Sequence, residues 1–426
     1  MYLCNKMTKS KNNKKSKSNN KSKNNNITIF HEYIEYHNKH IKKYGKKSLV
    51  LMQIGSFYEC YSTDTDGPDL YEISTLLNIT KTVKDKSNLT INYNNPYMLG
   101  FPMIAVEKYM PILVNNNYTV MVIDQVTPPP NPERGVVGIY SKCNYLDNIY
   151  TPESNFVACI YLEEVKQKNN KSLMLAGMSA VDLFNGKVYI HEAMSDNSDD
   201  KFAFDECNRF IIALQPKEIF IHVDSLIYNK KDFIIQYLEL DKKFYHYSDD
   251  LTNKSSKKYS NLTFQNEVLS KSYENKKSMI SMIEFLDLEK MLYATKSLVI
   301  LIDVCSDHDA NLINNLSTPQ TFMNSKYVIL GNNAPEQLNI IQSDTYESQG
   351  KIKSLLDIVN KASTCMGKRF IKSRLMSPLV NSNEIENIYQ TVEHFLKDDY
   401  YVKVEEILGN IKDIDRIERK IGLSAI

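Results

Sequence analysis

SLVLMQIGSFYECYS, residues 48–62, combines β-branched and aromatic side chains with a single glycine, Gly55. This composition predicts strand structure, and Gly55 permits the backbone to bend. Phe57 and Glu59 are two residues apart, so on a strand their side chains project from the same face. An apolar ring beside a carboxylate is unusual for a core. One interpretation is structural, with Phe57 packed inward at a sheet edge and Glu59 reaching water; the other is a binding site.

The residues around this stretch predict a compact α/β unit over residues 27–140. Apolar side chains from Phe30 to Tyr44 recur at helical spacing, and Gly45 follows where a helix would stop. Further along the chain we expect a second helical stretch, a polar loop at 84–95, a helix at 105–117, a buried strand at 119–126 and a Pro-rich loop at 127–135.

Two further regions follow. Residues 151–250 predict a sheet-plus-helix domain, because three consecutive strand patterns form a β-meander before a helix and another strand. Residues 262–426 predict an all-α domain, because long helical periodicities dominate from about residue 280. The chain is therefore expected to be a multidomain protein, which agrees with a length of 426 residues at about 150 residues per domain.

The net charge of +1 hides a strong asymmetry. Eight lysines and no acids lie in residues 1–26, which leaves a net charge of −7 on the other 400 residues. This Lys- and Asn-rich segment is predicted to be a disordered basic tail, because it has too few apolar groups to offset its ordering entropy. It is either an arm that attracts phosphates or directs nuclear import, or a solubilising tail.

Several classes of protein are excluded by what the sequence lacks. No apolar run approaches the ~20 residues that a membrane span requires. The seven cysteines are scattered without a CxxC, which favours reduced thiols, no zinc site and an intracellular protein. No GxxxxGK[ST], GxSxG or HExxH motif occurs. A two-metal nuclease site is also not expected, because Asp182 is the lone acid of its strand and Glu163 and Glu164 lie at a strand end.

Three blocks of sequence resemble the MutS family of DNA mismatch repair proteins, in the family's order. IGSFYECY, LLNIT (76–80) and LGFPMIAVEKYMPILV (99–114) are similar to its mismatch-recognition domain, and FVACIYLE…GMSAVDLFNGKVYI is similar to its RNase H-like connector domain. LNIIQSDTYESQGKIKSLLDIVNKASTCMGKRFIKSRLMSPL (338–379) resembles the start of its helical core domain. The spacing in MVIDQVTPPPNPERGVVGIYS is similar to the giant-virus and coral-mitochondrial branch.

The resemblance implies roles for four residues. Phe57 is the expected wedge that enters mispaired DNA, because a poorly stacked step costs less to open than a matched one. Glu59 is implied to accept a hydrogen bond from a displaced base. Tyr58 lies between these two residues and should face the opposite side of the strand, in the core. Lys81 and Lys84 match the family's polar loop, where they either contact phosphates or are ordinary solvated lysines.

The lever helices, clamp and ATPase of the family would follow this part of the sequence. We therefore expect no catalysis in this chain, and ATP and Mg²⁺ only where an ATPase region is supplied. The expected partner is double-stranded DNA with mispairs or small loops, together with a homodimer or a MutS-family ATPase partner. The alternative is a protein-interaction fragment, which would be favoured by an unburied apolar stripe at Val404, Ile407, Leu408, Ile411, Ile414, Ile417 and Ile421.

Overall fold

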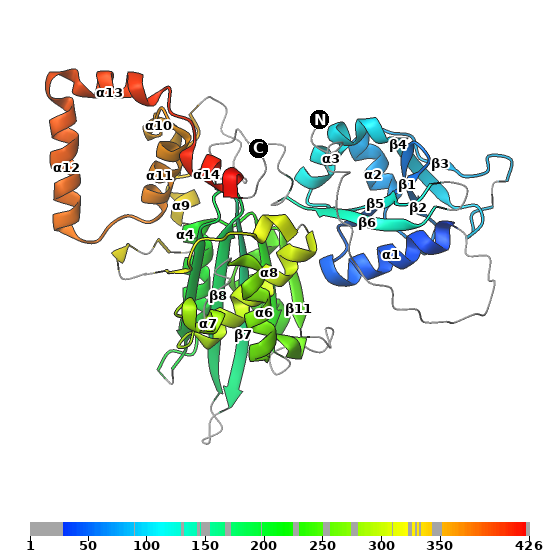
Figure 1. Cartoon of the computed structure of the whole chain (residues 1–426), viewed down its shortest axis with the longest axis horizontal. Helices are drawn as coiled ribbons and strands as arrows, with labels where there is room; N and C mark the ends of the chain where they lie inside the picture. Colours follow the sequence, from blue (N-terminus) through cyan, green and yellow to red (C-terminus); the bar gives the residue numbers. More distant parts are fainter. Residues whose placement is uncertain are drawn as a thin grey trace.

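A computed structural model shows three units in the order of the chain (Figure 1). It describes residues 29–88, 90–128, 132–142, 145, 154–166, 172–196, 198–224, 230–249, 256–273, 280–308, 310–322, 326–328, 330–331, 334–342 and 352–422. The predicted basic tail at 1–26 lies outside the described residues. We call residues 29–142 the first unit, 154–322 the second unit and 326–422 the third unit.

The first unit is a six-stranded sheet between two layers of helices, with strand order β3-β4-β2-β1-β5-β6. Helix α1 lies on the opposite side of the sheet from α2 and α3 (Figure 1). The elements are α1 Ile29–Tyr44, β1 Ser48–Ile54, β2 Phe57–Ser62, α2 Leu70–Leu77, β3 Thr82–Val83, β4 Tyr97–Pro102, η1 Met103–Ala105, α3 Val106–Asn115, β5 Thr119–Gln125 and β6 Arg134–Tyr140.

Local chemistry explains where these elements begin and end. Helix α1 stops before Gly45, whose φ of +84° is costly for other residues. The side chain of Asp69 accepts hydrogen bonds from the first backbone N–H groups of α2, and Asn78 ends that helix in the left-handed conformation. Gly55, with φ of +59°, is the first central residue of the two-residue turn between β1 and β2. Such tight hairpins favour glycine at this position.

Strand β6 is the main element of the first unit that the sequence analysis missed. The Pro-rich stretch 127–135 was expected to close the unit as a loop, yet a strand begins at Arg134 and pairs antiparallel with β5. It is an edge strand, and Val136 and Val137 are exposed on it. Proline excludes a central strand but not an edge strand that starts directly after it.

The second unit is a six-stranded sheet of order β11-β10-β7-β8-β9-β12, covered by helices on both faces. Strands β7, β8 and β9 form the predicted meander, and β10 and β11 run parallel to β7. The sheet of the second unit is therefore mixed, with both parallel and antiparallel strand pairs. The elements are β7 Phe156–Lys166, β8 Ser172–Asp182, β9 Val188–Met194, α4 Phe202–Leu214, β10 Glu218–Val223, α5 Lys231–Tyr237, β11 Tyr245–Asp249, α6 Leu262–Ser272, α7 Met282–Phe285, α8 Leu292–His308 and β12 Gln320–Thr321.

Helices α6 and α8 belong to the second unit, although the sequence analysis placed residues 262–426 in one helical region. Helix α8 packs across β7 and β8, and the Ser297 hydroxyl donates to the carbonyl of Cys159 over 2.8 Å. Gly177 allows this close approach, because a Cβ there would come within 1.9 Å of the carbonyl oxygen of Tyr293. Helical periodicity predicts a helix but does not identify the sheet that it covers.

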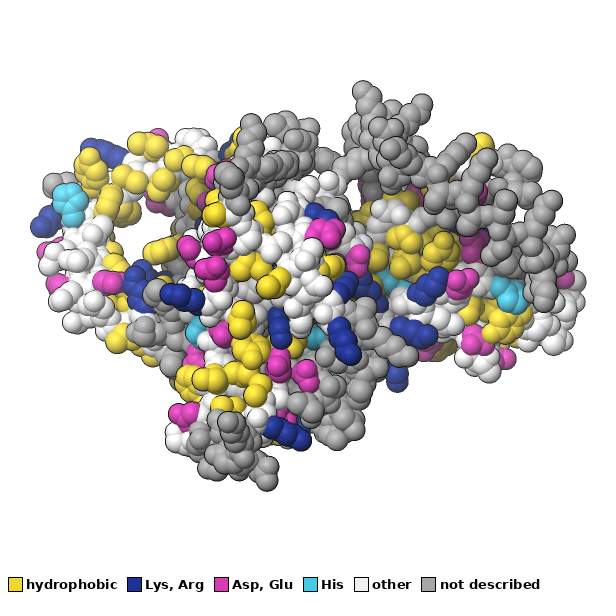
Figure 2. Space-filling model, turned by 60° about the horizontal axis from the view of Figure 1, so that its bottom comes forward, with side chains coloured by type: hydrophobic (Ala, Val, Ile, Leu, Met, Phe, Trp, Pro, Cys, Tyr) yellow, Lys and Arg dark blue, Asp and Glu magenta, His cyan; other side chains and the backbone are white. Residues whose placement is uncertain are grey.

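The third unit consists of helices that are largely exposed. Helices α12 and α13 project from the molecule as an arm (Figure 1), along which hydrophobic side chains are visible in Figure 2. The elements are α9 Ala334–Gln337, α10 Leu355–Val359, α11 Cys365–Met376, α12 Ser382–Leu396, α13 Tyr400–Leu408 and α14 Ile414–Gly422. No helix among the described residues is long and apolar enough to span a bilayer.

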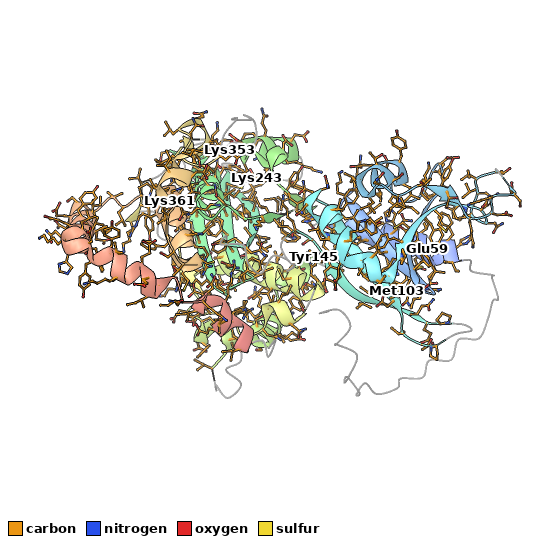
Figure 3. All side chains as sticks on the ribbon, turned by 90° about the horizontal axis from the view of Figure 1, so that it is seen from above. Glu59, Met103, Tyr145, Lys243, Lys353 and Lys361 are labelled. Atoms are coloured by element: carbon orange, nitrogen blue, oxygen red, sulfur yellow. The ribbon has the colours of Figure 1, made fainter. Side chains whose placement is uncertain are left out.

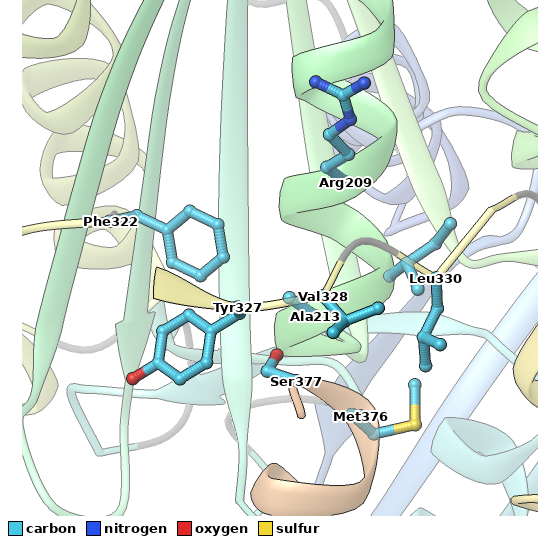
Figure 4. A pocket seen from close by; sticks show the side chains of 9 residues that line it. Arg209, Ala213, Phe322, Tyr327, Val328, Leu330, Met376 and Ser377 are labelled. Atoms are coloured by element: carbon cyan, nitrogen blue, oxygen red, sulfur yellow. The ribbon is translucent and has the colours of Figure 1, made fainter. Parts of the chain in front are cut away.

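The second and third units are in contact. Near the end of α11, Arg209, Phe322, Tyr327 and Met376 line a cavity of only about 20 Å³ (Figure 4), which is room for roughly one water molecule. Further along, the guanidinium of Arg419 on α14 donates to the carbonyl of Leu312 over 2.7 Å. These contacts fix the base of the arm while its outer helices stay exposed.

Hydrogen bonds also join the first and second units. The Ser141 hydroxyl donates to the buried carboxylate of Glu218 over 2.7 Å, and His246 contacts the other oxygen of Glu218 over 2.7 Å. The second ring nitrogen of His246 lies 3.1 Å from the carbonyl oxygen of Tyr44, the last residue of α1. The C-terminal end of α1 therefore contacts β11.

Candidate functional site

One face of β2 changes from exposed to buried along three alternate residues. Phe57, directly after the turn at Gly55, is 43% exposed, Glu59 is half-buried, and Tyr61 is 3% exposed. Their alternation places all three on the same face of the sheet. Phe57 and Glu59 thus lie together as predicted from their spacing, with the aromatic ring nearest to solvent.

A glycine on a neighbouring strand leaves room for the side chain of Glu59. It pairs with Met52 on β1 and with Gly100 on β4. A Cβ at Gly100 would come within 3.0 Å of Cγ of Glu59, so glycine at this position makes room for the side chain. The Tyr61 hydroxyl donates a hydrogen bond to Oε2 of Glu59. Sequence reasoning did not single out Tyr61 or Gly100, because neither residue carries a functional group that suggests a site by itself.

Tyr58 faces the other side of the strand, in the core. It is 6% exposed, and its hydroxyl donates to Asp124 on β5 over 2.8 Å. Burial, followed by the hydrogen bond to Asp124, raises the pKa of Tyr58 above its ordinary value. The segment therefore separates a structural tyrosine from the residues on the exposed face.

A second apolar group lies beside the turn. The backbone N–H of Met103 donates to the carbonyl of Ser56 over 2.9 Å, and Ile104 follows it with 93% of its surface exposed. Figure 3 labels Glu59 and Met103 in this part of the first unit. The sequence of this segment, LGFPMIAVEKYMPILV, does not by itself predict an exposed isoleucine. Phe57 and Ile104 give this end of the sheet an exposed apolar tip.

Lys81 directly precedes β3 in the sequence, and Lys84 directly follows it. Strand β4 separates β3 from β2. Lys81 is half-buried, with its Nζ 4.0 Å from the centre of the Tyr97 ring, whereas Lys84 is exposed. At about 4.8 Å between neighbouring strands, β3 lies roughly 10 Å from β2. Both lysines therefore lie at the β3 edge of the sheet, two strands away from Phe57 and Glu59.

The carboxylates considered for a nuclease site have structural roles. Asp182 is fully buried and accepts hydrogen bonds from the backbone N–H groups of Asn155 and Phe184, and burial raises its pKa. Glu163 pairs with Lys296 over 3.0 Å. Within the described part of the chain, no group of three or more His, Cys, Asp or Glu side chains could hold a metal ion.

Comparison with known proteins identifies both ends of the chain. The family model of MutS domain I matches residues 34–148, and that of MutS domain III matches residues 333–425. A DNA mismatch repair protein mutS homolog of Acanthamoeba polyphaga mimivirus is 37% identical over 422 residues, which cover 94% of this chain and 37% of that protein. This chain belongs to the MutS family.

Other MutS proteins are more distant but match the same part of the chain. The MutS protein of Caldanaerobacter subterraneus is 26% identical over 91% of this chain and 40% of its own length. The mitochondrial mutS homolog of the coral Sarcophyton glaucum is 24% identical over 92% of this chain and 43% of its own length. The chain thus spans about two fifths of the length of the curated relatives it matches, and these include viral and coral members, as the sequence indicated.

All four predicted site residues lie inside the MutS domain I match, and the second sheet lies between the two matched segments. The helical match begins at residue 333, beyond α6 and α8.

Proposed function

We propose that this chain binds mismatched double-stranded DNA in DNA mismatch repair, with Phe57 as an aromatic wedge and Glu59 as the acceptor of a hydrogen bond from the displaced base. The observation that carries this proposal is the exposed aromatic ring of Phe57 beside a half-buried, hydrogen-bonded carboxylate on one face of β2. The membership of the MutS family and the names of its relatives supply the substrate class.

The physical basis of discrimination is the difference in stacking between mispaired and matched steps. Inserting a ring between base pairs costs a few kcal/mol of unstacking, and this cost is lower where stacking is already poor. A carboxylate near DNA is repelled by phosphates, so Glu59 favours binding only where a base donates a hydrogen bond to it. An intact duplex offers no such displaced donor and is therefore rejected.

Lys81 and Lys84 are proposed to contact phosphates beside the wedge. Both lie at the edge of the same sheet, one on each side of β3. Contacts from lysine to phosphate position a protein on a duplex without reading its sequence, and they weaken as salt rises. These two residues would therefore contribute to binding of matched and mismatched DNA alike.

We further propose that the chain performs no catalytic step of its own, so that ATP and Mg²⁺ act only where an ATPase region is supplied. The absence of a GxxxxGK[ST] phosphate loop from residues 1–426 supports this proposal. A homodimer or a MutS-family ATPase partner would complete the assembly, and an intracellular location is part of the same proposal.

The test is fluorescence anisotropy of the full chain with a G·T-mismatched duplex and with its matched counterpart, each at two salt concentrations. We expect a preference for the mismatch that persists at the higher salt, because stacking and a hydrogen bond are less screened than phosphate contacts. Equal binding to both duplexes that disappears at the higher salt would contradict the proposal.

A second candidate function is recruitment of a protein partner through the third unit. Val404 is half-buried, and the rest of the predicted stripe is exposed: Ile407, Leu408, Ile411, Ile414, Ile417 and Ile421. An exposed apolar stripe of this kind is typical of an interaction surface. Sedimentation velocity of the chain with the ATPase region of a MutS relative tests this candidate. A complex that Ile407→Glu weakens and Lys403→Glu leaves intact would support it, and no complex would reject it.

A further inference from the structure

The carboxylate of Glu59 is restrained on one side. Its Oε2 accepts the hydrogen bond from the Tyr61 hydroxyl, and within the described residues this is the hydrogen bond that the Glu59 side chain makes. A carboxylate can accept several hydrogen bonds, so Oε1 keeps its capacity for another donor. The Glu59 side chain is half-buried and therefore not closed off from solvent.

Tyr61 is itself held rigidly. Its ring is buried and packs edge-to-face on that of Tyr33 from α1, with centroids 5.5 Å apart and an interplanar angle of 79°. The Tyr33 hydroxyl in turn donates to the carbonyl of Val50 on β1 over 3.2 Å. A series of contacts therefore links Tyr33 in the core, through Tyr61, to Glu59 at the site.

Gly100 on β4 also affects the position of Glu59, because its missing Cβ leaves the space that Cγ of Glu59 occupies. Two features from different strands thus define one position of the carboxylate. A side chain held in its binding geometry loses less conformational entropy on binding than a free one.

We propose that Tyr61 is a positioning residue for Glu59, which holds Oε2 in an internal hydrogen bond and presents Oε1 to a donor on the DNA. This inference rests on the proposed function and adds to it a residue that sets specificity. In this arrangement, a base must offer its donor at one position, and a donor placed elsewhere finds no acceptor.

The test compares two substitutions, each of which removes the hydroxyl group of one tyrosine. Tyr61→Phe removes the hydroxyl that contacts Glu59 and keeps the ring on Tyr33, whereas Tyr58→Phe removes a hydroxyl from the other face of the same strand. We expect Tyr61→Phe to lower the ratio of mismatched to matched affinity of the full chain by about twofold to tenfold, with matched affinity unchanged. Tyr58→Phe should leave this ratio unchanged.

A double-mutant cycle separates positioning from a general effect on the fold. In a Glu59→Gln background, Tyr61→Phe should cause no further loss of mismatch preference, because the residue acts through the carboxylate. An additive loss, or an unchanged preference in Tyr61→Phe alone while the unmodified chain discriminates, would overturn the inference and leave the proposed function standing. A chain without any mismatch preference would overturn both.

The contact can also be measured without DNA. In ¹³C NMR of the free chain with labelled glutamate carboxylates, the resonance that is absent from Glu59→Gln identifies Glu59. This resonance should shift in Tyr61→Phe and stay in place in Tyr58→Phe. An unchanged resonance in Tyr61→Phe would overturn the inference whatever the DNA measurements give.

Discussion

In the proposed function, mismatch recognition depends most directly on Phe57. Stacking of a base on an aromatic side chain contributes about 1–3 kcal/mol, so Phe57→Ala should lower affinity for a mismatched duplex by roughly tenfold or more and abolish the preference over matched DNA. Weak binding that is sensitive to salt should remain. Anisotropy titrations measure this loss. Tyr71→Ala, which removes an exposed ring on α2 away from the site, is the matched control. A retained preference in Phe57→Ala would exclude this residue as the wedge.

Gly177 lies at a close contact between β8 and α8. A Cβ there would lie 1.9 Å from the carbonyl oxygen of Tyr293, so Gly177→Ala forces β8 and α8 apart. Overpacking of this kind costs about 1–3 kcal/mol, which urea denaturation would measure as a lower free energy of unfolding. Gly331→Ala is the control, because no atom lies within 4 Å of the added Cβ. Equal stability of the two variants would contradict the close approach of helix and strand.

At the scale of elements, buried histidines on α1 and at the end of α8 oppose protonation of the folded chain. Burial lowers the pKa of His40 to about 4 and that of His308 to about 3. The unfolded chain takes up these protons near pH 6.5, whereas the folded chain does so only at lower pH. The contribution of these neutral histidines to the free energy of unfolding is therefore complete above pH 6.5. It is lost as the pH falls from 6.5 toward 4, by up to about 1.4 kcal/mol per pH unit for each histidine.

Chemical denaturation at pH 7 and at pH 5 measures this effect. The free energy of unfolding should be lower at pH 5, and His308→Phe should reduce the difference, because it keeps a ring beside Tyr44 and removes the titrating group. His394→Phe, at an exposed position on α12, is the control. If His308→Phe leaves the difference in the free energy of unfolding between pH 7 and pH 5 unchanged, this histidine does not contribute to that difference.

The elements differ in how far the sequence predicts them. Alternation and helical spacing predicted β7 to β10 and α1, because these patterns reflect burial within one element. They did not predict that α8 covers the second sheet, since this depends on the contact with Gly177, far away in the chain. At the site, the spacing of Phe57 and Glu59 predicted their shared face. The role of Tyr61 could not be predicted, because it depends on the pairing of β2 with its neighbours and on the position of α1.

At the scale of the whole molecule, the basic segment at 1–26 should act on all DNA equally. It carries eight lysines and no acids, so its deletion removes eight positive charges that would attract phosphates of any duplex. Affinity for matched and mismatched duplexes should fall by the same factor, and the dependence of affinity on salt should become less steep. Replacing the eight lysines with serine in the full chain is the matched control and should give the same result. A selective loss of mismatch binding would instead assign the segment a part in discrimination.

The late position of α8 in the chain has a consequence for synthesis on the ribosome. The first unit has all its strands and helices once residue 140 has emerged, whereas the meander of the second unit ends at Met194 and its covering helix begins only at Leu292. At a translation rate of about 5–20 residues per second, roughly 100 residues of delay leave one apolar face of that sheet open for about 5–20 s. During this interval we expect the nascent chain to bind chaperones that recognise exposed apolar surface.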